Sequence, residues 1–217
     1  MSNPAILTII IALVSFFLGS IPFGLIISKY IYHVDIREHG SGNIGTTNAL
    51  RTMGKRGGAA VFLLDFGKGL LSGLIAAHLA APLVAQPLVG WYQPTYSDML
   101  ALAFMGCTLG HIYSPWLKFK GGKGIAVAIG CLFITFGAPM ACCELLVFAL
   151  IVFGTKHVSQ GSIAAAIACP FFAVSVFWPD WTAVLLCTIA AGSVVWAHRE
   201  NIKRLREGTE RRIGEDK

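Results

Sequence analysis

Charged residues are scarce in this sequence. Only 13% of its 217 residues are Asp, Glu, Lys or Arg, whereas 55% are hydrophobic, and the mean hydropathy is +0.69. An average soluble domain has about 25% charged residues, so this chain has too few polar side chains to cover a water-exposed globule. The composition excludes a soluble enzyme and a disordered chain, and it indicates an integral membrane protein.

Several other patterns are missing as well. The six cysteines form no C-x-x-C pair, and all lie in apolar runs, so we expect small buried side chains rather than a disulfide framework. The sequence shows no cluster of metal ligands and no phosphate-binding G-x-x-x-x-G-K-[ST] motif. We therefore expect no metal and no cofactor. The net charge of +6 comes from loop residues, which favours membrane orientation over nucleic-acid binding as its cause.

Long apolar runs predict an all-α polytopic membrane protein that forms one transmembrane domain over residues 1–217. A bilayer-crossing helix needs about 20 mostly apolar residues. The run 124–154 is too long for one crossing, and Gly137-Ala-Pro139 interrupts it, so we predict two short helices there. Seven transmembrane helices are predicted in total, in 4–31, 58–83, 99–116, the two halves of 124–154, 158–178 and 181–197.

Positive charges lie on one set of connections only. Lys and Arg occur in segments 32–57 and 117–123, at Lys156 and in the tail, whereas 83–98, 137–141 and 178–181 contain none. The positive-inside rule then predicts an outside N-terminus and a cytoplasmic tail, 198–217, that begins with part of the site. In this tail Glu200 stands four residues before Arg204, a spacing that predicts a helix.

Four polar segments interrupt the apolar runs, and all fall on the predicted cytoplasmic side. These segments are residues 40–51, 120–124, 159–162 and 198–201. The first has Gly40, Gly42 and Gly45 in G-x-G-x-x-G spacing, but a membrane helix rather than a strand precedes it, which argues against a dinucleotide fold. Its glycines and the following helix N-terminus still suit an anion. Lys120 and Lys123, set among three glycines, favour a second anion nest.

The last two segments pair side chains on one helix face. Ser159 and Ser162 lie three residues apart, as do His198 and Asn201. The serines can cap a helix or bind a ligand. His198 stands where a predicted span reaches water, which is a suitable place for a general base.

A few ionisable residues fall inside or next to the apolar spans. Asp65 and Lys68 lie one helical turn apart, so we expect them to pair with each other. His111, at the inner end of its span, is a candidate for lining the site. Glu144 falls near the predicted outer face, where water is expected to reach it.

Taken together and in this order, these segments resemble those of the bacterial acyl-phosphate:glycerol-3-phosphate acyltransferase family. The matching residues are 41–51 (SGNIGTTNALR), 63–65 (LLD), 110–111, 118–124 (KFKGGKG), 158–163 and 198–210. The resemblance covers nearly all of residues 21–210. Thr46, Tyr113-Ser114-Pro115 and Gln160 depart from the usual family pattern without removing a candidate ligand.

The resemblance implies transfer of a fatty acyl group from acyl phosphate to the 1-position of sn-glycerol 3-phosphate. The products would be 1-acyl-glycerol 3-phosphate and phosphate, in the first step of phospholipid synthesis at the bacterial inner membrane. The implied glycerol 3-phosphate ligands are Ser41, Arg51, Lys123, His198 and Asn201, and all of them except Arg51 are also the candidate catalytic residues. The implied acyl phosphate ligands are Asn43, Thr47, Asn48, Gly121, Gly122, Gly124, Ser159 and Ser162. Membrane lipid is the expected surrounding, and the sequence indicates no protein partner.

Acyl phosphate is already activated, so no covalent cysteine is required. The proton acceptor stays open between His198 and a phosphate oxygen of the substrate. A class of lipid acyltransferases that uses a histidine five residues before an aspartate is disfavoured, because that motif is missing. An anion transporter is a further alternative, although its polar residues should also occupy the membrane midplane and the other face. A lipid-scaffolding protein would have no need of two glycine nests.

Overall fold

The computed structural model describes residues 4–83 and 94–214, and within these ranges every regular element is a helix. The α-helices are α1 (Pro4–Ser20), α2 (Phe23–Tyr30), α3 (Thr46–Ala80), α4 (Tyr96–Ile112), α5 (Ile125–Thr135), α6 (Gly137–Thr155), α7 (Val158–Phe177), α8 (Trp181–Ala197) and α9 (Arg199–Arg206). Three short 3-10 helices are η1 (Ile36–Glu38), η2 (Ala81–Leu83) and η3 (Pro115–Leu117). The all-α prediction is confirmed for these residues.

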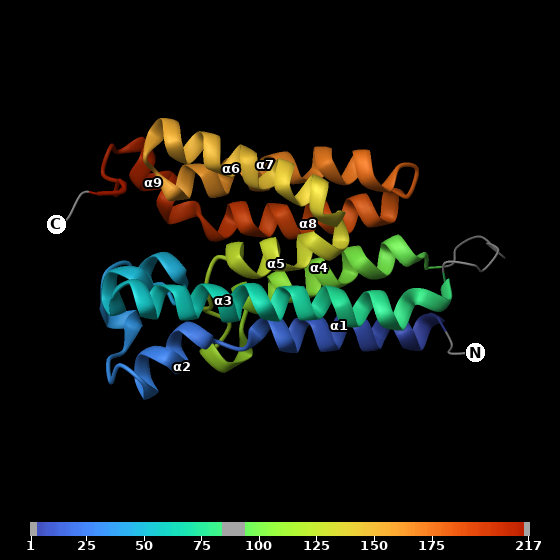
Figure 1. Cartoon of the computed structure of the whole chain (residues 1–217), viewed down its shortest axis with the longest axis horizontal. Coiled ribbons are helices and arrows are strands. Elements are labelled where there is room, and N and C mark those ends of the chain that lie inside the picture. The colour runs from blue at the N-terminus through green and yellow to red at the C-terminus, as the bar shows by residue number, and fades with distance from the viewer. Residues whose placement is uncertain (1–3, 84–93, 215–217) are drawn as a thin grey trace.

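The helices form an elongated bundle. α1, α3, α4, α5, α6, α7 and α8 run along its long axis, whereas α2 and α9 lie at the same end of the bundle, on opposite sides of it (Figure 1). The most extensive helix contacts join α3 with α5 and α1 with α4. The main hydrophobic core has buried residues from α1 and from α3 to α8 and includes Phe104, Val127, Cys131, Cys169 and Ala190. One end of the bundle is thereby free to carry polar loops.

The observed helix boundaries agree with the predicted ones in one place and differ from them in two. The predicted break near Pro139 is confirmed, because α5 and α6 meet there. The run 4–31 is two helices, because Pro22 has no N–H for helix hydrogen bonding and disfavours helical geometry before it. α3 begins at Thr46 rather than near residue 58, and it is kinked at Gly54, where φ is 71°. The polar segment 46–57 therefore extends the membrane helix toward the site.

Several described helices have the length and composition of membrane spans. Four stretches qualify, namely α1 with α2, α3 with η2, α6 and α7, and the bent pair α8–α9 is a fifth. α5 has 11 residues, so at about 1.5 Å per residue it is too short to cross a hydrocarbon core of about 30 Å. The chain is a polytopic helical membrane protein. The count of seven spans and the orientation of the termini stay predictions.

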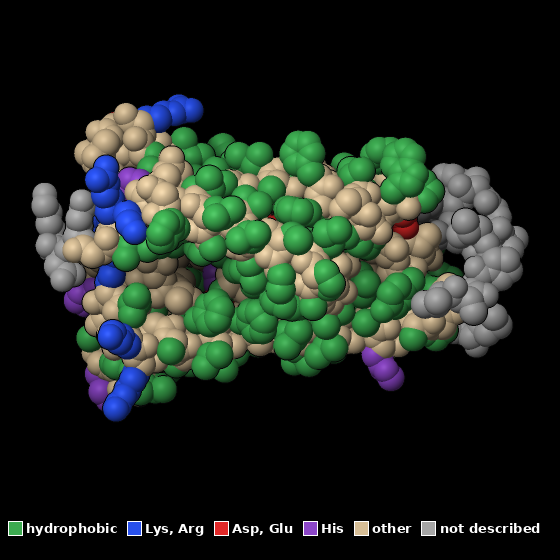
Figure 2. Space-filling model, turned by 45° about the horizontal axis from the view of Figure 1, so that its top comes forward, with side chains coloured by type: hydrophobic (Ala, Val, Ile, Leu, Met, Phe, Trp, Pro, Cys, Tyr) green, Lys and Arg blue, Asp and Glu red, His purple; other side chains and the backbone are tan. Residues whose placement is uncertain are grey.

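The surface separates apolar flanks from one charged end. Large apolar side chains such as Leu13, Leu63, Leu150 and Phe171 are exposed along the helices, and hydrophobic atoms cover the flank in Figure 2. On this face the Lys and Arg side chains gather at the end that carries α2 and α9. Soluble monomers rarely expose such extensive apolar surfaces, so the flanks are suited to lipid.

Two expectations about single side chains are wrong. Cys142 and Cys143 are exposed, although the other four cysteines are buried as expected. Glu144, expected in water, is buried and its side chain is only 7% exposed. Each residue of an α-helix is rotated by about 100° from the preceding one, so the register of α6 turns the two thiols outward and the carboxyl inward.

Glycines bring the two main helix pairs into close contact. A Cβ atom at Gly69 of α3 would lie 1.9 Å from the carbonyl oxygen of Val127, and one at Gly130 of α5 would lie 2.0 Å from that of Phe66. Gly19 of α1 and Gly110 of α4 likewise have no room for a Cβ atom, because the backbone of the other helix lies against them. Small residues let helix backbones approach closely in membranes, where packing drives association.

Substituting either glycine of the α3–α5 contact is expected to destabilise the bundle. Gly69→Ala and Gly130→Ala each force the backbones apart, at a cost of about 1–3 kcal/mol. Gly67→Ala in the same helix is the matched control, because nothing lies within 4 Å of its added methyl group. Thermal unfolding in detergent measures the difference. Equal melting temperatures for Gly130→Ala and Gly67→Ala would show that the close approach contributes nothing.

Candidate active site

A cleft of about 760 Å³ opens at the charged end of the bundle. Its walls come from the segment before α3, the first turns of α3 and α7, the loop before α5, the α8–α9 junction and the tail. The predicted residues that line it are Ser41, Asn43, Thr47, Asn48, Arg51, Lys123, Gly124, Ser159, Ser162, His198 and Asn201. The fold thus gathers four segments that are distant in sequence.

The segment before α3 is held in shape by Asn48. The Nδ2 group of this buried side chain donates to the carbonyl oxygens of Ile36, His39 and Asn43 at 2.9–3.1 Å, and its Oδ1 accepts from the Ser41 N–H at 2.8 Å. The polar atoms of Asn48 therefore organise the loop.

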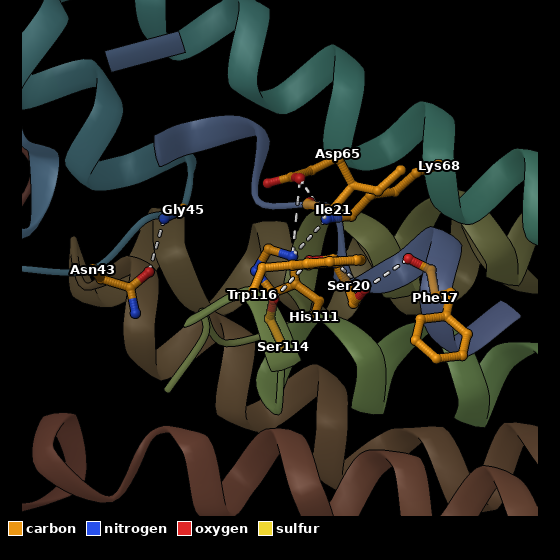
Figure 3. Close-up of polar contacts among 10 residues, drawn as sticks. All are labelled: Phe17, Ser20, Ile21, Asn43, Gly45, Asp65, Lys68, His111, Ser114 and Trp116. Carbon is orange, nitrogen blue, oxygen red and sulfur yellow. Dashed lines mark hydrogen bonds and ion pairs between the residues drawn. The ribbon is translucent and has the colours of Figure 1, made fainter. Parts of the chain in front are cut away.

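Glycine and an Asx turn complete this loop. Gly40 has a φ of +61°, and a Cβ there would lie 2.1 Å from the Asn48 amide oxygen. Asn43 Oδ1 accepts from the Gly45 N–H at 2.9 Å, as Figure 3 shows. α3 follows directly at Thr46, and the first N–H groups of a helix have no intrahelical partner. The loop therefore delivers a helix N-terminus to the cleft, which is a favourable anion site.

Arg51 of α3 and Lys123 of the loop before α5 bring positive charge to the cleft. Burial, with a smaller effect of the nearby charges of Arg204 and Arg51, lowers the pKa of Lys123 to about 8 against the opposing effect of Glu210. This lysine is charged at neutral pH and loses its charge in mildly alkaline solution.

His198 is buried and neutral. Its Nδ1 lies 2.8 Å from the carbonyl oxygen of Val194, and a carbonyl can only accept, so Nδ1 carries the proton and Nε2 is an acceptor. Burial and the charge of Lys123 lower the pKa of His198 to about 4. At neutral pH this side chain therefore offers a lone pair to the cleft and no charge.

Glu210 in the tail was part of the sequence resemblance but received no predicted role. Its Oε1 accepts from Ser159 Oγ and from Asn201 Nδ2, both at 2.7 Å. Its Oε2 accepts from Arg204 Nε at 2.7 Å. Arg204 thus binds Glu210 rather than Glu200, which stood at the helical spacing. Neither the distance in sequence nor any helix periodicity signals this contact.

A buried ionic network lies beneath the cleft (Figure 3). Lys68 Nζ is 2.8 Å from Asp65 Oδ1, which confirms the predicted pair, and it also donates to the Ile21 carbonyl oxygen at 2.7 Å. The same Nζ lies 3.0 Å from His111 Nδ1. The ammonium therefore joins α3, α4 and the break between α1 and α2. Asp65 and His111 also line the cleft.

Gly121 and Gly122 do not line the cleft. Their N–H groups donate to the carbonyl oxygens of Ile112 and His111 at 2.9 and 3.1 Å. A Cβ at Gly122 would lie 2.1 Å from His111 Nε2, and one at Gly121 would lie 2.0 Å from the His111 carbonyl oxygen. These glycines fix the loop against α4 and so set the position of Lys123.

The cleft continues into an apolar arm between α3, α5 and α6. Its walls there are Phe62, Phe66, Ile129, Phe133, Leu145 and Phe148. A narrow side pocket of about 40 Å³ adjoins it and ends near Glu144. One continuous space thus combines a polar, cationic end with an apolar arm.

Within residues 4–83 and 94–214, no group of three His, Cys, Asp or Glu side chains could hold a metal ion. The free groups of the cleft are instead N–H donors, cations and neutral acceptors. Such groups are suited to the phosphate and hydroxyl groups of a ligand.

Comparison with known proteins agrees with this geometry. Residues 9–208 match the sequence model of the family described as glycerol-3-phosphate acyltransferase. The glycerol-3-phosphate acyltransferases of Thermosynechococcus vestitus and Agrobacterium fabrum are 39% and 42% identical to the chain. The alignments cover 97% of both chains in the first case, and 98% of this chain and 94% of the relative in the second.

Solved structures give the same result. The fold is similar to the crystal structure of PlsY (YgiH), an integral membrane glycerol 3-phosphate acyltransferase, in its glycerol 3-phosphate form. The two sequences are 34% identical, and the TM-score of the superposition is 0.81. The match covers 95% of this chain and 96% of that one. The lysophosphatidic acid form gives a TM-score of 0.79 at 33% identity, with 95% of each chain covered. The chain therefore belongs to the glycerol-3-phosphate acyltransferase family.

Proposed function

We propose that the protein transfers a fatty acyl group from acyl phosphate to the sn-1 hydroxyl of glycerol 3-phosphate. Lysophosphatidic acid and inorganic phosphate are the products, and the reaction is the first step of bacterial phospholipid synthesis. The observation that carries this proposal is the single cleft in which a cationic, N–H-rich end continues into an apolar arm. Such a cleft suits two phosphate groups and one acyl chain at once.

Glycerol 3-phosphate occupies the polar end in this proposal. Arg51 and Lys123 bind its phosphate with Ser41, because an Arg fork and an ammonium suit phosphate oxygens. His198 and Asn201 hold the glycerol part. Placement of both substrates in one cleft can supply about 7–11 kcal/mol of the barrier.

The acyl phosphate lies with its chain in the apolar arm. Its phosphate meets the N-terminus of α3 at Thr47, the backbone at Gly124 and the backbone N–H groups that begin α7 at Ser159. Ser162 lies in the same turn of α7, and its hydroxyl group donates to the Val158 carbonyl oxygen. The remaining predicted ligands act indirectly. Asn43, Asn48, Gly121 and Gly122 shape the two loops through the contacts described above.

The membrane arrangement extends the same proposal. The charged end of the bundle faces the cytoplasm of the bacterial inner membrane, and the tail 198–217 completes the site from that side. Glycerol 3-phosphate then enters from the cytoplasm, and the acyl chain enters sideways between helices from the inner leaflet.

Purified protein with palmitoyl phosphate is expected to release phosphate only when sn-glycerol 3-phosphate is present. Arg51→Ala should lower kcat/KM for the acceptor about 100-fold, because a charged hydrogen-bonding group is lost. Arg56→Ala is the matched control, since Arg56 lies on the same helix, outside the cleft. Phosphate release that ignores the acceptor would contradict the proposal. Flux of labelled glycerol phosphate into vesicles without donor would favour the transporter.

Loss of the His198 side chain should be mild. We infer that positioning dominates and that no protein base is essential, because acyl phosphate is already activated and a His with a pKa of about 4 is a weak base. His198→Ala is expected to lower kcat/KM about tenfold, which is the effect of one hydrogen bond. Steady-state kinetics with both substrates measures it. Abolished turnover with unchanged substrate affinity would identify His198 as the base.

The rate should fall in alkaline solution because Lys123 is deprotonated. A lysine is charged below its pKa, so with a pKa of about 8 the cation is present at pH 7 and lost above pH 8. The value of kcat/KM reports the free enzyme and should fall above that pH. Lys123→Arg stays charged, so its lower activity should be flat between about pH 7.5 and 9.5. If kcat/KM fell in the same way above pH 8 in the wild type and in Lys123→Arg, Lys123 would be excluded as the titrating group.

A further inference from the structure

The tail after α9 folds back over the start of α7. The Gly208 N–H donates to Leu205 O at 3.3 Å, and Gly208 has a φ of +69°, so the chain reverses there. The Ile213 N–H then donates to Lys156 O at 2.9 Å. These contacts place Glu210 inside the cleft, where its side chain is only 9% exposed.

The Glu210 carboxylate can act only as an acceptor. Burial raises its pKa, but the hydrogen bonds from Ser159, Asn201 and Arg204 outweigh this effect and bring the pKa below its ordinary value. An ionised carboxylate has no proton to donate. Each of its three partners must therefore point a donor group at Glu210.

For Asn201 this contact decides which way the amide faces. Because Nδ2 donates to Glu210 at 2.7 Å, the amide group not bound to Glu210 is the Oδ1 acceptor. Asn201 Oδ1 is buried, and no described residue gives it a hydrogen bond. A buried acceptor without a partner costs free energy, so this atom is suited to a donor from the ligand.

The cleft carries further acceptors. Ser159 gives its hydroxyl proton to Glu210, which leaves the oxygen lone pairs. His198 has an unprotonated Nε2 for the reason given above. The same cleft has donors, which come from Arg51, Lys123 and the α3 N-terminus. The cleft thus combines acceptors for hydroxyl groups with donors for phosphate.

From this geometry we infer that Glu210 is a positioning residue that turns Asn201 Oδ1 toward the glycerol hydroxyl groups of the acceptor. The inference rests on the proposed function and adds a selectivity step to it. Glu210 orients the acceptor without touching it, because its oxygens are occupied by Ser159, Asn201 and Arg204. A molecule that keeps the phosphate but lacks a hydroxyl group should bind less well for this reason alone.

The test compares sn-glycerol 3-phosphate with 3-hydroxypropyl phosphate, which lacks the 2-hydroxyl group. The wild-type protein should prefer glycerol 3-phosphate by about tenfold in kcat/KM. Glu210→Ala should bring this ratio close to one. Asn201→Ala should have the same effect, and the double variant should add nothing, because both residues act as one unit. Glu207→Ala, an exposed residue nearby, is the control and should keep the ratio.

Two further measurements keep the inference falsifiable. If Glu210→Ala does not fold, Glu210→Gln replaces it in the test. The amide oxygen of this glutamine can still accept the hydrogen bond from Asn201, so the variant should keep part of the preference for glycerol 3-phosphate. If wild-type protein shows no turnover, the proposed function fails, and calorimetric binding of the two phosphates without donor still tests the ratio. An unchanged ratio in both Glu210 variants overturns the inference.

Discussion

Lys68 places a positive charge in the apolar interior, and the groups that compensate it come from separate parts of the bundle. Asp65 supplies the counter-charge from α3, the Ile21 carbonyl oxygen supplies an acceptor from the break after α1, and His111 supplies a ring nitrogen from α4. A buried charge is costly unless it is paired and hydrogen-bonded. These elements must therefore meet at Lys68. Because His111 also holds the Gly121–Gly122 turn, the same cluster sets where Lys123 enters the cleft.

The cleft above this cluster combines three kinds of environment. Cations and helix N–H groups line it together with neutral acceptors, and aromatic and aliphatic side chains line its arm. Each environment suits one part of the proposed substrates: phosphate, hydroxyl and acyl chain. No covalent intermediate is needed, because an acyl phosphate is already reactive. The contribution of the protein is to hold the two substrates together in the right orientation.

Much of this site could be predicted from the sequence, because polar segments are conspicuous between apolar runs. Arg51, Lys123 and His198 were selected in this way, and all three line the cleft. Residue spacing did not show which polar atoms have hydrogen-bond partners in the protein and which remain available to a ligand. Asn48 uses its amide within its own loop, and Arg204 pairs with Glu210 instead of Glu200. Such choices depend on hydrogen-bond geometry at a scale of tenths of an ångström, which residue spacing does not contain.

The sequence by itself determined the class of protein, the helical character of its apolar runs and the one-sided distribution of positive charge, because these follow from local composition and from the cost of exposing polar groups to lipid. It also determined the four polar segments. Only the tertiary structure decided that segments 40–51, 120–124, 159–162 and 198–201 share one cleft, since glycine contacts between α3 and α5 and between α1 and α4 set the helix spacing. It likewise decided the place of Glu210, because a tail residue reaches α7 only when the chain folds back, and that fold depends on contacts between residues far apart in sequence.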